Sequence, residues 1–177
     1  MRLFAAIGKQ FAPRMGRRRM MMNIKQDIAL ELQRLAPSGG ELEVRTSTGR
    51  IIGQLETVDT VGCAFTRFDY QSSTLAAATI DGLKALSAKI QQRLTYLLEP
   101  ISLLETDAES VSIQMRSSPP QVGDDGRSYY ELLVRRGGEV TLRRYHKAAG
   151  QPRQIIAAHV TREVLGRLAD DFVAVIG

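Results

Sequence analysis

The sequence predicts an α+β protein in which an antiparallel sheet of about six strands is covered by helices on one face, in the order α-βββ-α-(β)βββ-α. Two observations favour this class. Segments with alternating apolar residues are joined by short turns that contain glycine, which is typical of antiparallel strands. Other segments have apolar residues three and four positions apart, which is typical of helices that pack on a sheet.

In the first half, a short helix is predicted to begin after Asn23, whose side chain can cap it. Its buried face is made by Ile24, Ile28, Leu32 and Leu35. Residues 41–73 are then interpreted as three strands, with turns at residues 48–49 and 59–62. These connections are short enough for an antiparallel meander.

The second half begins with a long helix, predicted from the spacing of apolar residues after Ser73 and ended by Pro100. Residues 101–118 are expected to form one or two strands. Residues 128–147 are expected to form a hairpin that turns at Gly137 and Gly138. A last helix is predicted from about residue 154 to residue 175.

The two halves are similar to each other. Five apolar positions of the second helix match five of the last helix at a shift of 78 residues, and "VGCAFTRFDY" aligns with "GGEVTLRRYH" at a shift of 76 residues. This match predicts either a duplicated βββα unit, with repeats at residues 41–98 and 109–176, or two similar amphipathic helices in one α+β fold.

The positive charge of the chain is concentrated at its start. The formal net charge is +5, but residues 1–22 carry six basic and no acidic side chains, which leaves 18 basic and 19 acidic side chains in residues 23–177. We predict one domain over residues 23–177. Residues 1–22 are interpreted as a basic disordered extension or as a mis-assigned start upstream of Met20, Met21 and Met22. As an extension, they also fit a transit peptide or an arm for nucleic acid.

Several classes of protein are excluded. A single cysteine, Cys63, excludes an internal disulfide framework. No apolar run reaches the roughly 20 residues that a helix needs to cross a bilayer. We therefore expect a cytoplasmic protein without a membrane segment.

The sequence contains no motif for catalysis, metal binding or cofactor binding. His146 and His159 are not in a metal-binding spacing, and Cys63 has no neighbouring histidine. Residues 124–126 lack the spaced acids of a calcium loop, and no glycine-rich phosphate loop is present. We expect a non-enzymatic protein with no cofactor and no metal.

The candidate binding site is a group of arginines on the predicted hairpin. We expect Arg135, Arg136, Arg143 and Arg144 to face one another, with Tyr145 beside them and with Arg116 nearby. Like charges on paired strands are unfavourable unless an anion or an acidic partner screens them. Such residues suit a phosphate, an acidic peptide or a single-stranded nucleic acid. The alternative is a solvated surface on which Glu131, Glu139 and Asp107 pair with the arginines.

A homodimer is expected from the open face of the sheet. If Tyr130, Leu132, Val134 and Leu142 point outward there, they form an apolar surface that a second copy would cover.

Two resemblances bear on function. The element order over residues 23–177 is similar to that of small dimeric secretion chaperones, which implies a protein that binds an extended segment of a partner protein. The segment "GRIIGQLETVDTVGCAF" resembles the strand-turn region of Sm-like RNA-binding proteins, although their asparagine is absent after Asp59. The first predicts a chaperone-like adaptor. The alternative is a module for nucleic acid or anions that uses the hairpin 129–146.

Overall fold

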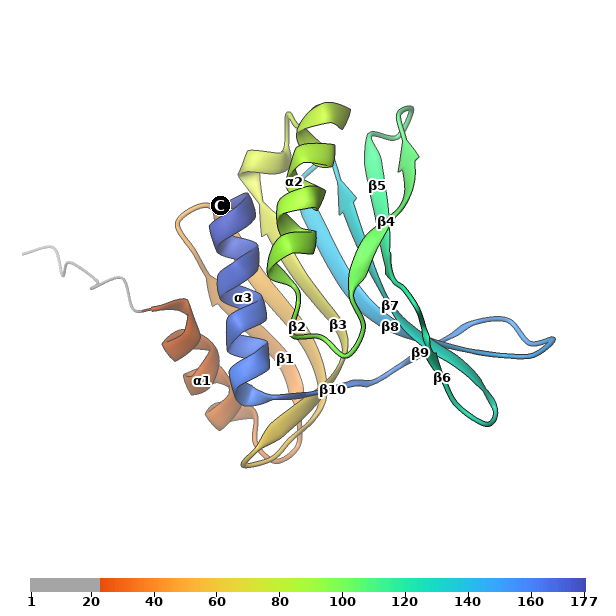
Figure 1. Ribbon diagram of the computed structural model, residues 1–177. Helices are drawn as coiled ribbons and strands as arrows, with labels where there is room; N and C mark the ends of the chain where they lie inside the picture. Colours follow the sequence, from red (N-terminus) through yellow and green to blue (C-terminus); the bar gives the residue numbers. More distant parts are fainter. Residues whose placement is uncertain (1–22) are drawn as a thin grey trace, which may run out of the picture.

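The computed structural model describes residues 23–177, and their elements confirm the α+β class. Within these residues, three α-helices lie on one face of a large antiparallel sheet (Figure 1). Within the described residues, no helix is long and apolar enough to cross a membrane. The prediction for residues 1–22 lies outside the described residues.

Each helix begins where a polar side chain caps it. Asn23 accepts a hydrogen bond from the backbone N–H of Lys25 (3.1 Å), as predicted. Thr79 and Thr161 accept corresponding bonds, also of 3.1 Å, from residues three positions ahead. These caps satisfy N–H groups that have no partner within a helix. They set the starts of α1 (Ile24–Leu35), α2 (Ile80–Arg93) and α3 (Arg162–Ile176).

The predicted extents of the second and last helices are wrong. The second one starts late, after the 3₁₀ turn η1 (Ser73–Leu75), and ends at Arg93 because Leu94 leaves helical geometry. The last one does not include residues 154–161, which form the strands β9 (Gln154–Ile156) and β10 (Ala158–Thr161). Pairing with β8 and β3 satisfies the backbone of this segment, so the apolar spacing there does not produce a helix.

In the described residues, the main sheet has seven strands in the order β1-β2-β3-β8-β7-β5-β4, and three short strands attach to it, so the expected number of about six is an undercount. The strands β3 and β8 pair at its middle. Whether the two halves arose by duplication stays a prediction. The bounds are β1 (Gly40–Arg45), β2 (Gly49–Val58), β3 (Gly62–Ser72), β4 (Ile101–Asp107), β5 (Ser112–Ser117), β6 (Gln121–Val122), β7 (Gly126–Arg135) and β8 (Glu139–Ala148).

The predicted turns are confirmed. Between β2 and β3, the Asp59 carboxylate accepts hydrogen bonds from the backbone N–H groups of Val61 (2.7 Å) and Gly62 (2.6 Å). These two hydrogen bonds hold the pKa of Asp59 below its usual range, and the bond from Gly62 has the larger effect. Between β7 and β8, Gly137 and Gly138 have φ angles of 102° and 110°, a region that residues with a Cβ rarely adopt.

The core lies between the sheet and the helices. Phe68 of β3 contacts α3, where its ring centroid is 6.0 Å from that of Phe172, so this face of the sheet is the covered one. Leu142 pairs with Phe68 and therefore points the same way. The expected apolar surface on the open face is wrong. All four residues assigned to it are at most 1% exposed: Tyr130, Leu132, Val134 and Leu142.

Candidate functional site

The structure does not bring the four hairpin arginines together. Across β7 and β8, Arg135 is opposite Glu139, Glu131 is opposite Arg143, and Tyr130 is opposite Arg144. Arg136 lies in the turn and is exposed. The predicted facing of like charges is therefore wrong, because the turn at residues 137–138 sets a register in which each strand arginine meets an acid or a tyrosine.

Arg144 belongs to the interior. Its guanidinium group pairs with Glu99 (Nη2 to Oε1, 3.0 Å) and donates to the Gln121 side chain (2.6 Å). The same group lies 4.6 Å from the ring centroid of Tyr130. Arg144 is only 6% exposed, so it holds the segment before β4 and strand β6 against β8 and does not offer its charge to a ligand.

At the other end of the hairpin, Arg135 forms an ion pair with Glu139 beside the turn. Glu139 also pairs with Arg67 of β3 (2.7 Å). The interpretation of a solvated surface with paired charges applies to this end. The third acid of that interpretation, Asp107, accepts hydrogen bonds from its own turn and pairs with no arginine within residues 23–177.

The remaining three candidates, Arg116, Arg143 and Tyr145, share the open face of the sheet. They surround Glu131, whose Oε1 atom lies 2.5 Å from Arg116 Nη2 and 2.6 Å from Arg153 Nη1. Arg153 comes from the loop between β8 and β9. One carboxylate, 7% exposed, thus holds two arginines in place. The charge of Glu131 helps raise the pKa of Arg153 although burial lowers it.

Two tyrosines fix the orientation of the same arginines. The rings of Tyr129 and Tyr145 are stacked, with centroids 6.0 Å apart and planes 26° apart. Arg116 lies 4.6 Å from the Tyr129 centroid, and Arg153 lies 4.4 Å from the Tyr145 centroid. Cation–π contacts of this kind contribute about 0.5–1 kcal/mol each at exposed sites. The four side chains therefore form an ordered row.

Arg143 is different, because it has no ion pair within the described residues. Its cross-strand neighbour Glu131 is already engaged by two other arginines, and the buried Nε atom of Arg143 has no hydrogen-bond partner in residues 23–177. A small cavity of about 290 Å³ lies beside it. That cavity is lined by Gln114, Glu131, Leu133, Thr141, Arg143, Tyr145 and Arg153.

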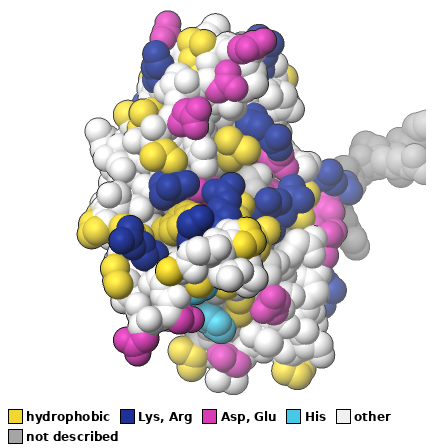
Figure 2. Space-filling view, turned by 90° about the vertical axis from the view of Figure 1, so that its right-hand side faces the viewer, with side chains coloured by type: hydrophobic (Ala, Val, Ile, Leu, Met, Phe, Trp, Pro, Cys, Tyr) yellow, Lys and Arg dark blue, Asp and Glu magenta, His cyan; other side chains and the backbone are white. Residues whose placement is uncertain are grey.

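A larger groove of about 730 Å³ adjoins this cluster, where β4, β5, β7 and β8 lie next to one another. Its basic side chains are Arg116, Arg127 and Lys147, and none of the described residues that line it is acidic. Leu103 and Leu104 of β4 add apolar surface. Figure 2, viewed from the side on which β5 to β9 lie, shows a band of basic side chains with hydrophobic ones between them.

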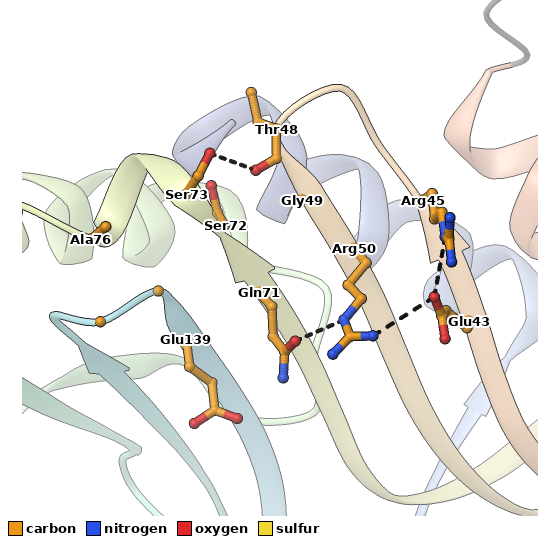
Figure 3. Close-up of a pocket in the computed structure, with 12 residues that line it drawn as sticks. Glu43, Arg45, Thr48, Gly49, Arg50, Gln71, Ser72, Ser73, Ala76 and Glu139 are labelled. Carbon is orange, nitrogen blue, oxygen red and sulfur yellow. Dashed lines mark hydrogen bonds and ion pairs between the residues drawn. The ribbon is translucent and has the colours of Figure 1, made fainter.

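The cavity on the other half of the open face has a neutral lining. It has a volume of about 690 Å³, and its charged lining residues are Glu43, Arg45, Arg50 and Glu139 (Figure 3). Glu43 lies 3.4 Å from Arg45 and 3.9 Å from Arg50, and Arg50 Nε donates to Gln71 (2.8 Å). Because these cations have partners, this cavity is a weaker candidate for binding an anion.

The groove of about 730 Å³ that Arg116, Arg127 and Lys147 line is called the basic groove below. Among the described residues, neither a histidine nor Cys63 lines it. His146 lies between Ser128 (3.2 Å) and Asp125 (3.6 Å), but Asp125 is on an exposed loop and none of these three residues lines the groove. Burial raises the pKa of Cys63 to about 11, so its thiol stays protonated at neutral pH. Residues 23–177 contain no cluster of three or more His, Cys, Asp or Glu side chains that could hold a metal ion.

Sequence reasoning missed five residues of this surface: Arg127, Tyr129, Glu131 as a binding residue, Lys147 and Arg153. Alternation along β7 and β8 was the signal that could have found most of them, because every second residue points to the same face. No sequence signal places Arg153, which reaches the cluster from a loop.

Comparisons with known proteins assign this chain to no family. No family model, no curated protein and no solved structure matches it.

Proposed function

We propose that this chain is a non-enzymatic binding protein that holds an extended, acidic segment of a partner protein in the basic groove. One observation carries the proposal. Within the part of the chain that the structure describes, the groove of about 730 Å³ is lined by Arg116, Arg127 and Lys147 and by no acidic residue. A partner with carboxylates would supply the missing counter-charges, which favours association and fixes its register.

The edge strand beside the groove supports an extended partner. Among the described strands, β4 pairs with β5 alone, so its outer edge offers backbone N–H and C=O groups. Its Leu103 and Leu104 are 47% and 48% exposed. A segment added along such an edge gains backbone hydrogen bonds, and its alternate side chains gain charge and apolar contacts.

The arrangement of the tyrosines favours protein over nucleic acid. Binding of single strands relies on aromatic faces on which bases stack. Here Tyr129 and Tyr145 cover one face of each other, and Arg116 and Arg153 lie over their rings. Nucleic acid is therefore an alternative outcome of the test. Action in the cytoplasm belongs to the same proposal. Homodimerisation stays an expectation, and the apolar face expected to drive it is buried.

The test uses fluorescence anisotropy with three labelled probes: a short peptide of alternating Glu and Leu, the same peptide with Gln for Glu, and an oligothymidine of similar length. The variant Arg127→Gln/Lys147→Gln removes two groove cations. The matched control Arg45→Gln/Arg50→Gln removes two cations from the lining of the neutral cavity on the same face.

We expect the Glu peptide to bind more tightly than the Gln peptide and the oligothymidine. We expect the groove variant to weaken Glu-peptide binding about tenfold or more and the control variant to leave it within about twofold. Equal binding of the Glu and Gln peptides would contradict the proposal. Tighter binding of the oligothymidine, lost in the groove variant and decreasing steeply with salt, would establish the nucleic-acid alternative.

A further inference from the structure

Of the three arginines around Glu131 on the open face, which are Arg116, Arg143 and Arg153, only Arg143 has no ion pair within residues 23–177. The strand register places it directly opposite Glu131, yet that carboxylate is held by Arg116 at 2.5 Å and by Arg153 at 2.6 Å. Among the described residues, the buried Nε atom of Arg143 has no hydrogen-bond partner. A buried donor without a partner costs about 1–3 kcal/mol, so Arg143 lacks the compensation that Arg116 and Arg153 receive from Glu131.

The charge around this donor indicates the charge of the missing group. Arg116, Arg143 and Arg153 carry three positive charges around the single negative charge of Glu131, which leaves a net charge of +2. A carboxylate would neutralise half of this. A phosphoryl group, with a charge of about −1.5 to −2 at neutral pH, would neutralise nearly all of it.

The remaining lining residues suit the same group. The lining of the cavity of about 290 Å³ includes the amide of Gln114, which can donate hydrogen bonds to phosphoryl oxygens. Its volume is at the lower limit of about 300–1,000 Å³ for small-molecule sites. It therefore suits a single phosphoryl group with the side chain that carries it.

We infer that this cavity is a subsite for a phosphorylated side chain of the partner segment. The inference rests on the proposed function, because the row of Arg116, Tyr129, Tyr145 and Arg153 links the two sites: Arg116 and Tyr129 line the groove, and Tyr145 and Arg153 line the cavity. An extended segment bound in the groove would bring one of its side chains over the row to Arg143. Arginine suits this task because its planar group binds phosphate through two parallel hydrogen bonds.

The experiment compares three labelled peptides of alternating acidic and apolar residues that differ at one central position, which is phosphoserine, Glu or Ser. Binding is measured by anisotropy for the wild-type chain, for Arg143→Gln and for Arg143→Lys. The matched control is Arg50→Gln, which removes a paired arginine from the same face. Thermal unfolding of each variant reports whether it folds. Inorganic phosphate is titrated as a competitor against a chloride control of equal ionic strength.

We expect the phosphoserine peptide to bind at least about tenfold more tightly than the Glu peptide. This preference should disappear in Arg143→Gln, should decrease in Arg143→Lys and should persist in Arg50→Gln. Equal affinities of the phosphoserine and Glu peptides for the wild-type chain would overturn the inference, whether or not any variant folds. So would a preference that survives in folded Arg143→Gln.

Two arms separate this inference from the proposed function. If the Glu peptide binds and the phosphoserine peptide binds no more tightly, the proposed function of the groove is retained and the phosphoryl subsite is wrong. If inorganic phosphate competes as strongly as the phosphoserine peptide binds, while the Glu and Ser peptides do not bind, the cavity takes free phosphate, and both the partner segment and the proposed function are wrong.

Discussion

Arg143 and Arg144 are neighbours in β8, but their side chains lie on opposite faces of the sheet and differ in whether an acid pairs with them. Arg144 points to the covered face, where Glu99 neutralises it 3.0 Å away and Tyr130 packs on it. Arg143 points to the open face, where Glu131 lies opposite it but forms its ion pairs with Arg116 and Arg153. The same residue type is therefore neutralised on one face and has no ion pair within the described residues on the other, and the difference is whether a free acid lies within reach.

The largest expected effect tests the covered face. We expect Glu99→Leu to lower the free energy of unfolding by about 3–5 kcal/mol, because it leaves the buried charge of Arg144 without a partner. The double variant Glu99→Leu/Arg144→Met should recover most of this loss, since it removes both charges. Urea denaturation measures both. A loss below about 1 kcal/mol in the single variant would show that water screens this pair and that the two faces do not differ as described.

An intermediate effect is expected for the acid of the open face. Glu131→Gln removes the charge that holds Arg116 and Arg153, whose side chains are 36% and 44% exposed. Because water screens these arginines, we expect a loss of about 1–2 kcal/mol, between the values for surface and buried pairs. The phosphoserine peptide should bind more tightly to this variant at low salt. Weaker binding would indicate that Glu131 acts mainly by orienting the arginines.

Asp69 provides a smaller, pH-dependent test on the open face. It is 1% exposed, and its Oδ2 atom lies 2.5 Å from Arg67 Nε, although the contact is poorly aligned for a hydrogen bond. Burial raises the pKa of Asp69 above its usual value. The folded state therefore keeps this proton to a higher pH than the unfolded state, and stability falls as the pH rises from about 4 through the folded pKa.

Asp69→Asn should remove this part of the pH dependence. Denaturant midpoints measured from pH 4 to pH 7 should fall less steeply for the variant than for the wild-type chain. Parallel curves would show that Arg67 offsets the cost of burying the Asp69 charge.

The smallest loss of stability is expected for Arg143→Gln. Arg143 has no ion pair to lose within residues 23–177, and the variant removes a buried Nε atom without a hydrogen-bond partner, so the free energy of unfolding should stay the same or rise by up to about 1–3 kcal/mol. Peptide binding and stability would then be separated in one residue. A loss as large as that of Glu99→Leu would mean that Arg143 supports the fold in the same way as Arg144.

The register of the hairpin was within reach of sequence reasoning, and the partners of its arginines were not. The glycine pair at residues 137–138 marks the turn, and counting outward from it places Arg143 opposite Glu131. Counting residues along the hairpin cannot show that Glu131 already pairs with Arg116 and Arg153, because Arg153 comes from a loop. Counting also cannot identify Glu99 as the partner of Arg144, because Glu99 lies 45 residues earlier in the chain and meets Arg144 only after the chain has packed.

The sequence by itself determined the local features of this protein: the cap at Asn23, the glycine turns and the alternation that separates the two faces of each strand. These depend on backbone geometry and on neighbours a few residues apart. Only the tertiary structure decided which face is covered, where residues 154–161 pair, and which of the arginines are neutralised. Those outcomes depend on groups that are distant in the chain, because the charge of a side chain is free or paired according to what packing brings within a few ångströms of it.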